Sequence, residues 1–158
     1  MAVALRRSEV AGTVFGLEQA ARYLAEVLPA WMQDLGLVIE KIEAMKPVGA
    51  PEDWQPGALL RLPFAARFCR DGGVVCGPAL MALADSAMLF ACAAAWNGYR
   101  PTAPIDQTTH FLRPVSFDVL ADARVVRIGR TTTFSRVSLL SATDRRPVGM
   151  VSAAYAML

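Results

Sequence analysis

The sequence predicts an α+β protein in which one antiparallel sheet wraps around a single long apolar helix. Residues 79–96 form an almost unbroken apolar run, too long for a strand. After residue 104 the hydrophobic pattern changes to period two, over about four strands joined by short turns and not by crossover helices. A length of 158 residues suits one domain. We therefore expect residues 1–158 to form a single domain.

The N-terminal part is expected to add a helical segment, at about residues 17–36. Gly36 is a plausible end for this segment, and Pro29 is expected to bend or split it. Residues 37–46 suggest a strand, with a helical continuation as the alternative. Residues 47–57 contain three prolines and two glycines, so they form a loop. The side chains at helical spacing are Ala21, Leu24, Leu28, Trp31, Met32 and Leu35.

The second strand and the long helix come next along the chain. Residues 58–68 alternate and predict a strand, and residues 70–75 predict a turn. Gly77 lies near the expected N-cap of the long helix, and Pro78 suits its first turn because proline needs no backbone N–H partner there. The later strands are expected at about 105–113, 119–129, 132–143 and 148–157.

Composition narrows the classes of partner. The chain is 54% hydrophobic with a mean hydropathy of +0.35, which suggests apolar surface covered in an oligomer. Its 16 basic and 14 acidic residues are scattered, so we expect no nucleic-acid partner. Three cysteines without a CxxC pattern and one histidine, His110, argue against a zinc site. Free thiols suit a reducing cytoplasm.

Two segments resemble membrane signals without matching them. Residues 79–96 are long enough to span a bilayer, but Asp85 inside them would cost about 2.5–3.5 kcal/mol. We therefore expect a buried core helix and no membrane partner. The N-terminus has arginines after a very short apolar run and does not match a signal peptide.

Four motifs resemble the hotdog-fold acyl-CoA thioesterases of the phenylacetate-pathway (PaaI-like) type, over about residues 35–158. They are "GGVVCGPALMALADSAM", "FLRP", "LADARVVRIGRT" and "VGMVSAAYAML". The resemblance implies a hotdog fold and hydrolysis of an acyl-CoA thioester to a free acid and coenzyme A. It implies no cofactor beyond the coenzyme A of the substrate. It also implies a homo-oligomer, either a dimer or a dimer of dimers.

The resemblance also assigns roles at the start of the helix. The family helix usually begins His-Gly-Gly, often with an Asn before it; this chain has Cys76 in place of the His and Arg70 in place of the Asn. Gly77 matches the glycine whose backbone N–H points at the thioester carbonyl. Asp85 stands in the place of the family's catalytic acid.

The chemistry of thioester hydrolysis fits these residues. The carbonyl oxygen needs donors where negative charge develops, and a helix N-terminus supplies free N–H groups. Pro78 has no N–H, so Gly77 is the best donor. Asp85 is the candidate base or nucleophile. Eight residues separate the two, about 12 Å along a helix. One chain's Asp85 therefore reaches a thioester at a partner's Gly77 more easily than at its own.

Further residues are candidates for binding the substrate. Gln107 and Thr109 share a strand face with Ile105 and Phe111, so they either line the site or form a polar edge at a subunit boundary. Arginines suit the phosphates of coenzyme A. Arg130 is the best single choice because similar family members carry GRT near the cofactor. The full substrate-binding set is Arg70, Cys76, Gln107, Thr109, Arg113, Arg130 and Thr131, with Arg127 and Arg136 as further phosphate candidates.

Several alternatives stay open at this point. Asp85 is either catalytic or a structural acid held by a cap or a partner. Ser86 is expected to hydrogen-bond back to its own helix. Cys76 with His110 would be a nucleophilic pair, although a cysteine is commonly a small buried hydrophobe. The chain as a whole is either a thioesterase, a non-catalytic hotdog protein that binds acyl-CoA or only assembles, or a dehydratase of the same superfamily.

Overall fold

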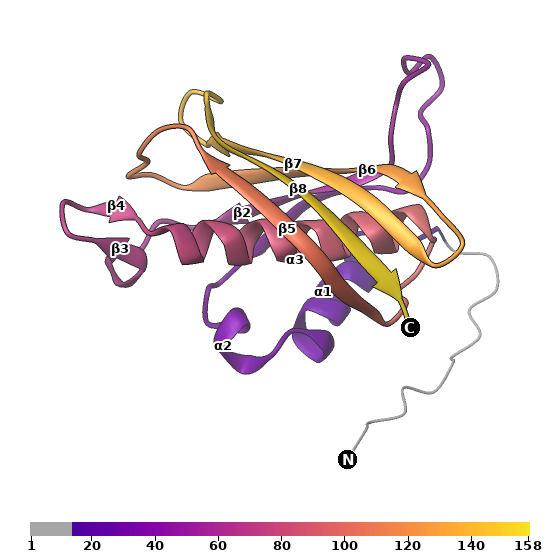
Figure 1. Cartoon of the computed structure of the whole chain (residues 1–158), viewed down its shortest axis with the longest axis horizontal. Helices are drawn as coiled ribbons and strands as arrows, with labels where there is room; N and C mark the ends of the chain where they lie inside the picture. The colour runs from indigo at the N-terminus through magenta and orange to yellow at the C-terminus, as the bar shows by residue number, and fades with distance from the viewer. Residues whose placement is uncertain (1–13) are drawn as a thin grey trace.

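The structure is a computed structural model that describes residues 14–158. The main element of the fold is a six-stranded sheet. Neighbouring strands are antiparallel throughout, in the order β1-β2-β6-β7-β8-β5. The sheet curves over the long helix α3, Gly77–Ala95 (Figure 1). The predicted sheet around an apolar helix is therefore confirmed. The strands are β1 Val38–Glu43, β2 Gly57–Leu62, β5 Thr102–Phe111, β6 Val119–Ile128, β7 Thr132–Ser141 and β8 Pro147–Met157.

The core lies between α3 and the inner face of the sheet. Pro78 stands in the first turn of α3, where its missing N–H costs nothing. Leu83, Met88 and Phe90 are almost fully buried. By length and composition α3 could cross a membrane, but 67% of its most apolar window is buried inside the fold. It is the core helix of the domain, as expected.

Alternation along the central strands separates an inner from an outer face. On β6, Ala121 and Ala123 are fully buried toward α3, while Asp122 and Arg124 alternate with them on the outer face. The inner face is mostly small and aliphatic. The outer face carries charge, which is the pattern of an antiparallel sheet with one face on the core.

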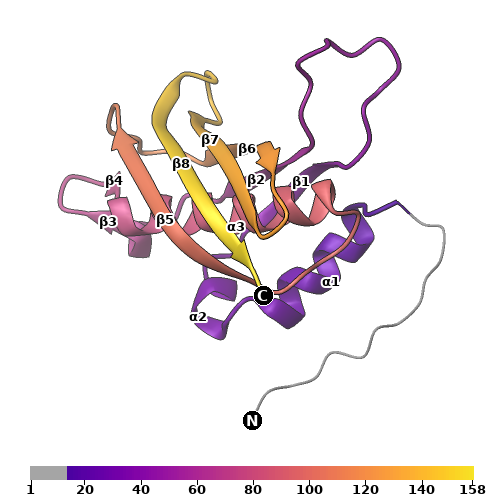
Figure 2. The same ribbon diagram turned by 45° about the vertical axis from the view of Figure 1, so that its right-hand side comes forward.

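The N-terminal segment is two helices where the sequence suggested one span of 17–36. They are α1, Leu17–Val27, and α2, Ala30–Gln33, and the chain is extended at Leu28 and Pro29 between them. Pro29 splits the segment, as predicted. Both helices lie on the side of α3 away from β6 and β7 (Figures 1 and 2). Trp31, which the helical spacing placed with the apolar side chains, is 60% exposed.

Three other predictions need correction. The helical alternative for 37–46 is wrong, because β1 pairs with β2. The strand expected over 58–68 ends at Leu62, before Pro63, and residues Ala66–Phe68 form a short 3-10 helix. The turn expected at 70–75 is a small hairpin of β3, Cys69–Arg70, with β4, Val74–Val75.

The strand β5 forms one edge of the sheet. It pairs with β8 on one side, and within the described residues no strand pairs with its other side. Three large apolar side chains on or next to it, Ile105, Phe111 and Leu112, are about half exposed. A long exposed edge of this kind is a template for another strand.

Candidate functional site

Asp85 lies in the middle of α3, on the part of the helix that is incompletely covered. The hydroxyl of Tyr155, from β8, donates a hydrogen bond of 2.5 Å to Asp85 Oδ1. Tyr155 is 4% exposed. Burial, reinforced by the negative charge of Asp85, raises the pKa of the Tyr155 phenol far above its usual value. The phenol is therefore protonated at every working pH and always serves as the donor.

Gly77 is the first residue of α3, so its N–H has no partner within the helix. The aromatic ring of Phe111, at the end of β5, lies over it. A Cβ built on Gly77 would stand 3.1 Å from Phe111 Cζ. A side chain here would require the Phe111 ring to shift by a few tenths of an ångström, so the close approach favours glycine. Cys76 is the N-cap residue; it is half-buried and its N–H donates to the Phe68 carbonyl at 2.8 Å.

The strand face predicted for Gln107 and Thr109 is the one that looks toward α3. Gln107 Nε2 lies 3.5 Å from the Met81 carbonyl oxygen and 3.4 Å from Thr109 Oγ1. Together with Phe111 over Gly77, these contacts show that β5 runs antiparallel to α3. Gln107 and Thr109 are therefore between the helix start and the level of Asp85, and both are half-buried.

The arginine candidates lie at two opposite ends of α3. Arg70 and Arg113 are exposed near its N-terminus, Arg70 on the hairpin and Arg113 beyond the end of β5. Arg130 and Thr131 are exposed in the β6–β7 turn, at the end where α3 finishes (Figure 1). A helix of 19 residues is about 28 Å long. One chain therefore does not bring Arg130 and Gly77 together. Arg127 and Arg136 are also exposed, the latter on the outer face beside Arg124.

The structure confirms the prediction for Ser86 and contradicts the alternative that pairs Cys76 with His110. Ser86 is fully buried and its hydroxyl donates to the Ala82 carbonyl at 2.9 Å, so the bond back to its own helix is confirmed. His110 is exposed and alternates with Thr109 and Phe111, which face α3. It points to the outer face, whereas Cys76 starts the helix under the inner face. The Cys76–His110 pair is therefore wrong.

Sequence reasoning missed Tyr155, the residue that holds Asp85. The period-two pattern of the last strand puts Tyr155 on the same face as Val151 and Ala153, so its burial was readable. Its partner was not, because 70 residues separate it from Asp85. Phe111 over Gly77 was missed for the same reason.

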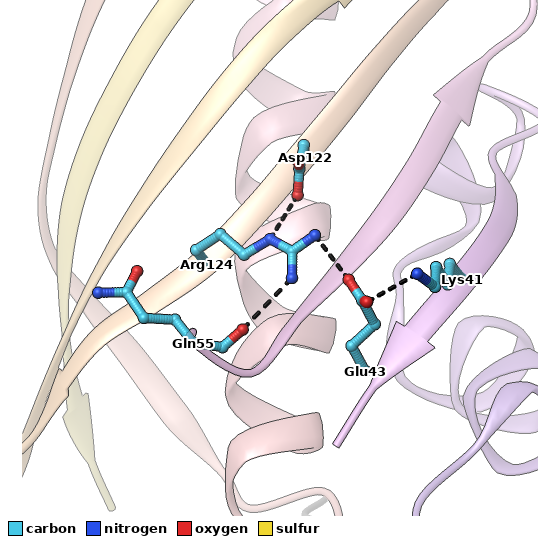
Figure 3. Close-up of polar contacts among 5 residues, drawn as sticks. All are labelled: Lys41, Glu43, Gln55, Asp122 and Arg124. Carbon is cyan, nitrogen blue, oxygen red and sulfur yellow. Dashed lines mark hydrogen bonds and ion pairs between the residues drawn. The ribbon is translucent and has the colours of Figure 1, made fainter. Parts of the chain in front are cut away.

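A cavity of about 420 Å³ lies elsewhere, on the outer face beneath the loop that joins β1 to β2. Figure 3 shows the charged cluster beside it. Arg124 contacts Glu43 at 2.6 Å, Asp122 at 2.7 Å and the Gln55 carbonyl at 3.3 Å, and Lys41 contacts Glu43 at 2.7 Å. Each charge is matched by an opposite one. We interpret the cluster as a structural network that ties β1, β6 and the loop together.

Comparison with known proteins agrees with the observed fold. The sequence model of the thioesterase superfamily matches residues 72–148. The fold and this match define the class: the chain has the hotdog fold, and the resemblance to thioesterases that its motifs indicated is confirmed. No curated protein matches the sequence.

Solved structures resemble the chain over most of its length. A conserved protein of Pseudomonas aeruginosa is 26% identical, with a TM-score of 0.68, over 85% of this chain and 98% of that one. The PaaI protein from the phenylacetic acid degradation operon of E. coli is 21% identical, with a TM-score of 0.71, over 90% and 93% of the two chains. A mutant PaaI of Thermus thermophilus is 24% identical, with a TM-score of 0.65, over 82% and 100%. The likeness to the PaaI proteins is one of fold.

Proposed function

We propose that the protein hydrolyses an acyl-CoA thioester to a free acid and coenzyme A, at sites that each combine two copies of the chain. The observation that carries the proposal is the placement of Gly77 and Asp85 on one helix. Gly77 offers a free N–H at the helix start, and Asp85 a half-buried carboxylate eight residues later, beside the unpaired edge β5. Two such helices, antiparallel across a two-fold axis, set one chain's Gly77 opposite the other's Asp85.

The proposed reaction needs only these groups and water. The Gly77 N–H stabilises the negative charge that develops on the thioester oxygen. Asp85 either takes a proton from the attacking water or attacks the carbonyl carbon itself. If water attacks, its oxygen bonds to the acyl carbon, the C–S bond breaks, and the proton held by Asp85 passes to the thiolate of coenzyme A. If Asp85 attacks, it forms an acyl anhydride as the C–S bond breaks; water then cleaves the anhydride to the free acid and Asp85, and the proton left on Asp85 neutralises the thiolate. Both routes end in the same products.

The edge strand and the arginines support the dimer. Pairing of β5 with β5 of a second copy would satisfy the unpaired edge and cover Ile105 and Leu112. It would also bring the second copy's Arg130 and Thr131 toward the end of the helix where Gly77 lies. Arg113 and Arg70 are already at that end, so a coenzyme A phosphate would meet arginines from both chains.

A second function also has an observation in its favour. The Tyr155 hydroxyl satisfies Asp85, as it would satisfy a purely structural acid. The family His and Asn are replaced by Cys76 and Arg70. A non-catalytic protein that binds acyl-CoA would show both features. We favour hydrolysis, because a structural acid gives no reason for Asp85 to remain half-exposed on an otherwise apolar helix. In either case, three free cysteines suit a cytoplasmic protein.

Two measurements test the proposal. The protein is incubated with a panel of short, medium, long and aromatic acyl-CoA thioesters, and free thiol is recorded with time; acyl-CoA binding is measured by calorimetry on the same preparation. Turnover of at least one thioester supports hydrolysis. Binding without turnover overturns it in favour of the binding protein.

Mixing inactive subunits tests the shared site. Asp85→Asn removes the carboxylate, and Gly77→Pro removes the N–H at a position where proline suits the helix. Each variant alone should be nearly inactive. Co-expressed with different tags and purified as a mixed dimer, they restore one intact site, so turnover should recover to about half of the wild-type rate per dimer. No recovery, or a single-chain mass of 17.0 kDa by light scattering, contradicts the dimeric site.

A further inference from the structure

We infer that Tyr155 is a positioning residue for Asp85: it fixes one carboxylate oxygen so that the other is aimed at the substrate. The inference rests on the proposed hydrolysis and names a residue that neither the motifs nor the family match singles out. It starts from the hydrogen bond of 2.5 Å from the Tyr155 hydroxyl to Asp85 Oδ1.

Tyr155 is held rigidly enough to act as a reference point. It lies near the end of β8, the strand between β7 and β5, with Thr133 on one side and Pro104 on the other. It is 4% exposed, and its neighbour Thr133 is fully buried. Its phenol ring therefore has little freedom, since a side chain in a packed core keeps to one rotamer.

Asp85 needs such a reference because its own helix gives it none. Its neighbours one turn away are Met81, Ala82 and Leu89, which offer no side-chain donor. Within residues 14–158, Tyr155 is the one side chain that hydrogen-bonds to Asp85. Without it the carboxylate would rotate among its rotamers. A base or nucleophile acts well only when its reacting atom is held close to the productive geometry.

The hydrogen bond also gives the two oxygens of the Asp85 carboxylate different roles. Oδ1 accepts from Tyr155, and Oδ2 remains available on the half-exposed side of the helix. The phenol is a neutral donor that keeps its proton, so it orients the carboxylate without neutralising it. Lysine or arginine in the same place would form an ion pair and compete with the substrate for Asp85.

The test replaces Tyr155 by Phe, which removes one oxygen and keeps the ring. We expect kcat to fall by about 10- to 100-fold, the usual cost of losing an orienting group, while KM changes less than about twofold. The matched control is Tyr99→Phe. Tyr99 is also partly buried and packs against the ring of Tyr23 at 5.5 Å. Its loss of a hydroxyl should leave both constants unchanged.

A double-mutant cycle separates positioning from a structural role. If Tyr155 acts through Asp85, adding Tyr155→Phe to Asp85→Asn lowers the residual kcat no further. If Tyr155 only supports the fold, kcat per folded molecule stays at the wild-type value in the single variant and the melting temperature alone falls; that result overturns the inference. Multiplicative losses in the double variant overturn it as well.

The remaining outcomes are also decisive. If Tyr155→Phe does not fold, Asp85→Glu takes its place: it keeps the charge but shifts the carboxylate by one methylene relative to Tyr155, so kcat should fall by at least about tenfold. An unchanged kcat for Asp85→Glu contradicts positioning. If Asp85→Asn is fully active, the proposed hydrolysis through Asp85 fails, and this inference with it. If Asp85→Asn is inactive but Tyr155→Phe is not, only the inference fails.

Discussion

Acidic side chains on the two sides of the sheet are held in opposite ways, Asp85 of α3 on the inner side and Glu43 and Asp122 on the outer side. On the inner face, Asp85 has one neutral donor, the Tyr155 hydroxyl, and no cation among the described residues. On the outer face, Glu43 contacts both Lys41 and Arg124, and Arg124 also contacts Asp122 (Figure 3). Ion pairs stabilise the charged forms of all their members. The Tyr155 hydroxyl, by contrast, is a neutral donor that contacts one oxygen of Asp85, and our proposal assigns the other oxygen to catalysis.

The backbone helps the outer network to form. Glu43, Gly57 and Arg124 are successive partners across β1, β2 and β6. A Cβ on Gly57 would stand only 2.8 Å from Arg124 Cδ, so glycine clears the path between Glu43 and the guanidinium. On the inner side of the sheet, the long side chain of Tyr155 spans the distance to Asp85 by itself.

The pKa values of the outer network reflect its ion pairs. Burial alone would raise the pKa of Glu43, but the Lys41 hydrogen bond and the Arg124 charge outweigh it, and the pKa is lowered. Burial opposes the charge of Arg124 too, and Asp122 and Glu43 outweigh it, so the pKa of Arg124 is raised. The ion pairs of the outer face therefore favour the charged forms of Glu43 and Arg124, which stabilises the fold, whereas Asp85 has no ion pair within the described residues.

We expect the largest effect from the variant Asp85→Asn, which tests whether the inner acid takes part in the reaction. Asp85→Asn keeps the size of the side chain and its acceptor for Tyr155 but loses the charge. Turnover should fall by at least about 100-fold, the low end for a general base, while acyl-CoA affinity changes little. The melting temperature should hold or rise, because a poorly solvated charge is removed. Free-thiol release and thermal unfolding are measured on one preparation.

The outer-face counterpart is Asp122→Asn, which leaves the inner face untouched. It should keep wild-type turnover and lower the melting temperature by about 2–4 °C, corresponding to about 1 kcal/mol for a partly exposed ion pair. The comparison collapses if the two variants behave alike, with Asp85→Asn costing only stability or Asp122→Asn costing rate.

The pH dependence of stability tests the role of the Glu43 charge on the outer face. The pKa of Glu43 is lower in the folded chain than its ordinary value of 4.5, so its stabilisation is present above that value and is lost as the pH falls below it. Glu43→Gln should therefore lower the free energy of unfolding by about 1–3 kcal/mol near neutral pH. As the pH falls below 4.5 the variant and the wild type should converge, because the Glu43 carboxylate becomes protonated once the pH reaches its lowered pKa. A difference in urea unfolding that stays constant across this pH range would show that the charge of Glu43 is not the cause.

The smallest effect concerns a polar group of the inner face that lacks a partner. Thr133 is fully buried beside Tyr155, and its hydroxyl has no hydrogen bond within the described residues. Thr133→Val keeps the shape and removes this hydroxyl, so stability should be unchanged or rise by up to about 1 kcal/mol. Turnover should not change. A marked loss of either would show that the hydroxyl serves the Asp85–Tyr155 pair.

Local patterns in the sequence were enough to predict the architecture, whereas the site residues that they suggested stay predictions. The apolar run at 79–96 and the period-two strands after residue 104 predicted the helix inside its sheet, because burial patterns repeat along the chain. Gly77 and Asp85 were singled out by the resemblance to the thioesterases and by the chemistry of a helix N-terminus and a carboxylate, and their roles stay predictions. The arginine at position 130 was proposed from its motif, and its role stays a prediction.

Contacts between residues far apart in the sequence could be read from the three-dimensional structure alone. Tyr155 reaches Asp85 across 70 residues of chain, Phe111 covers Gly77 from another strand, and Arg124 contacts Glu43 on β1 and the Gln55 carbonyl in the loop before β2. Such contacts follow from strand order and register, and local periodicity specifies neither. Two other differences have local causes. The strand β2 ends at Leu62 because Pro63 has no N–H to pair, and Trp31 is exposed because α2 is only one short turn.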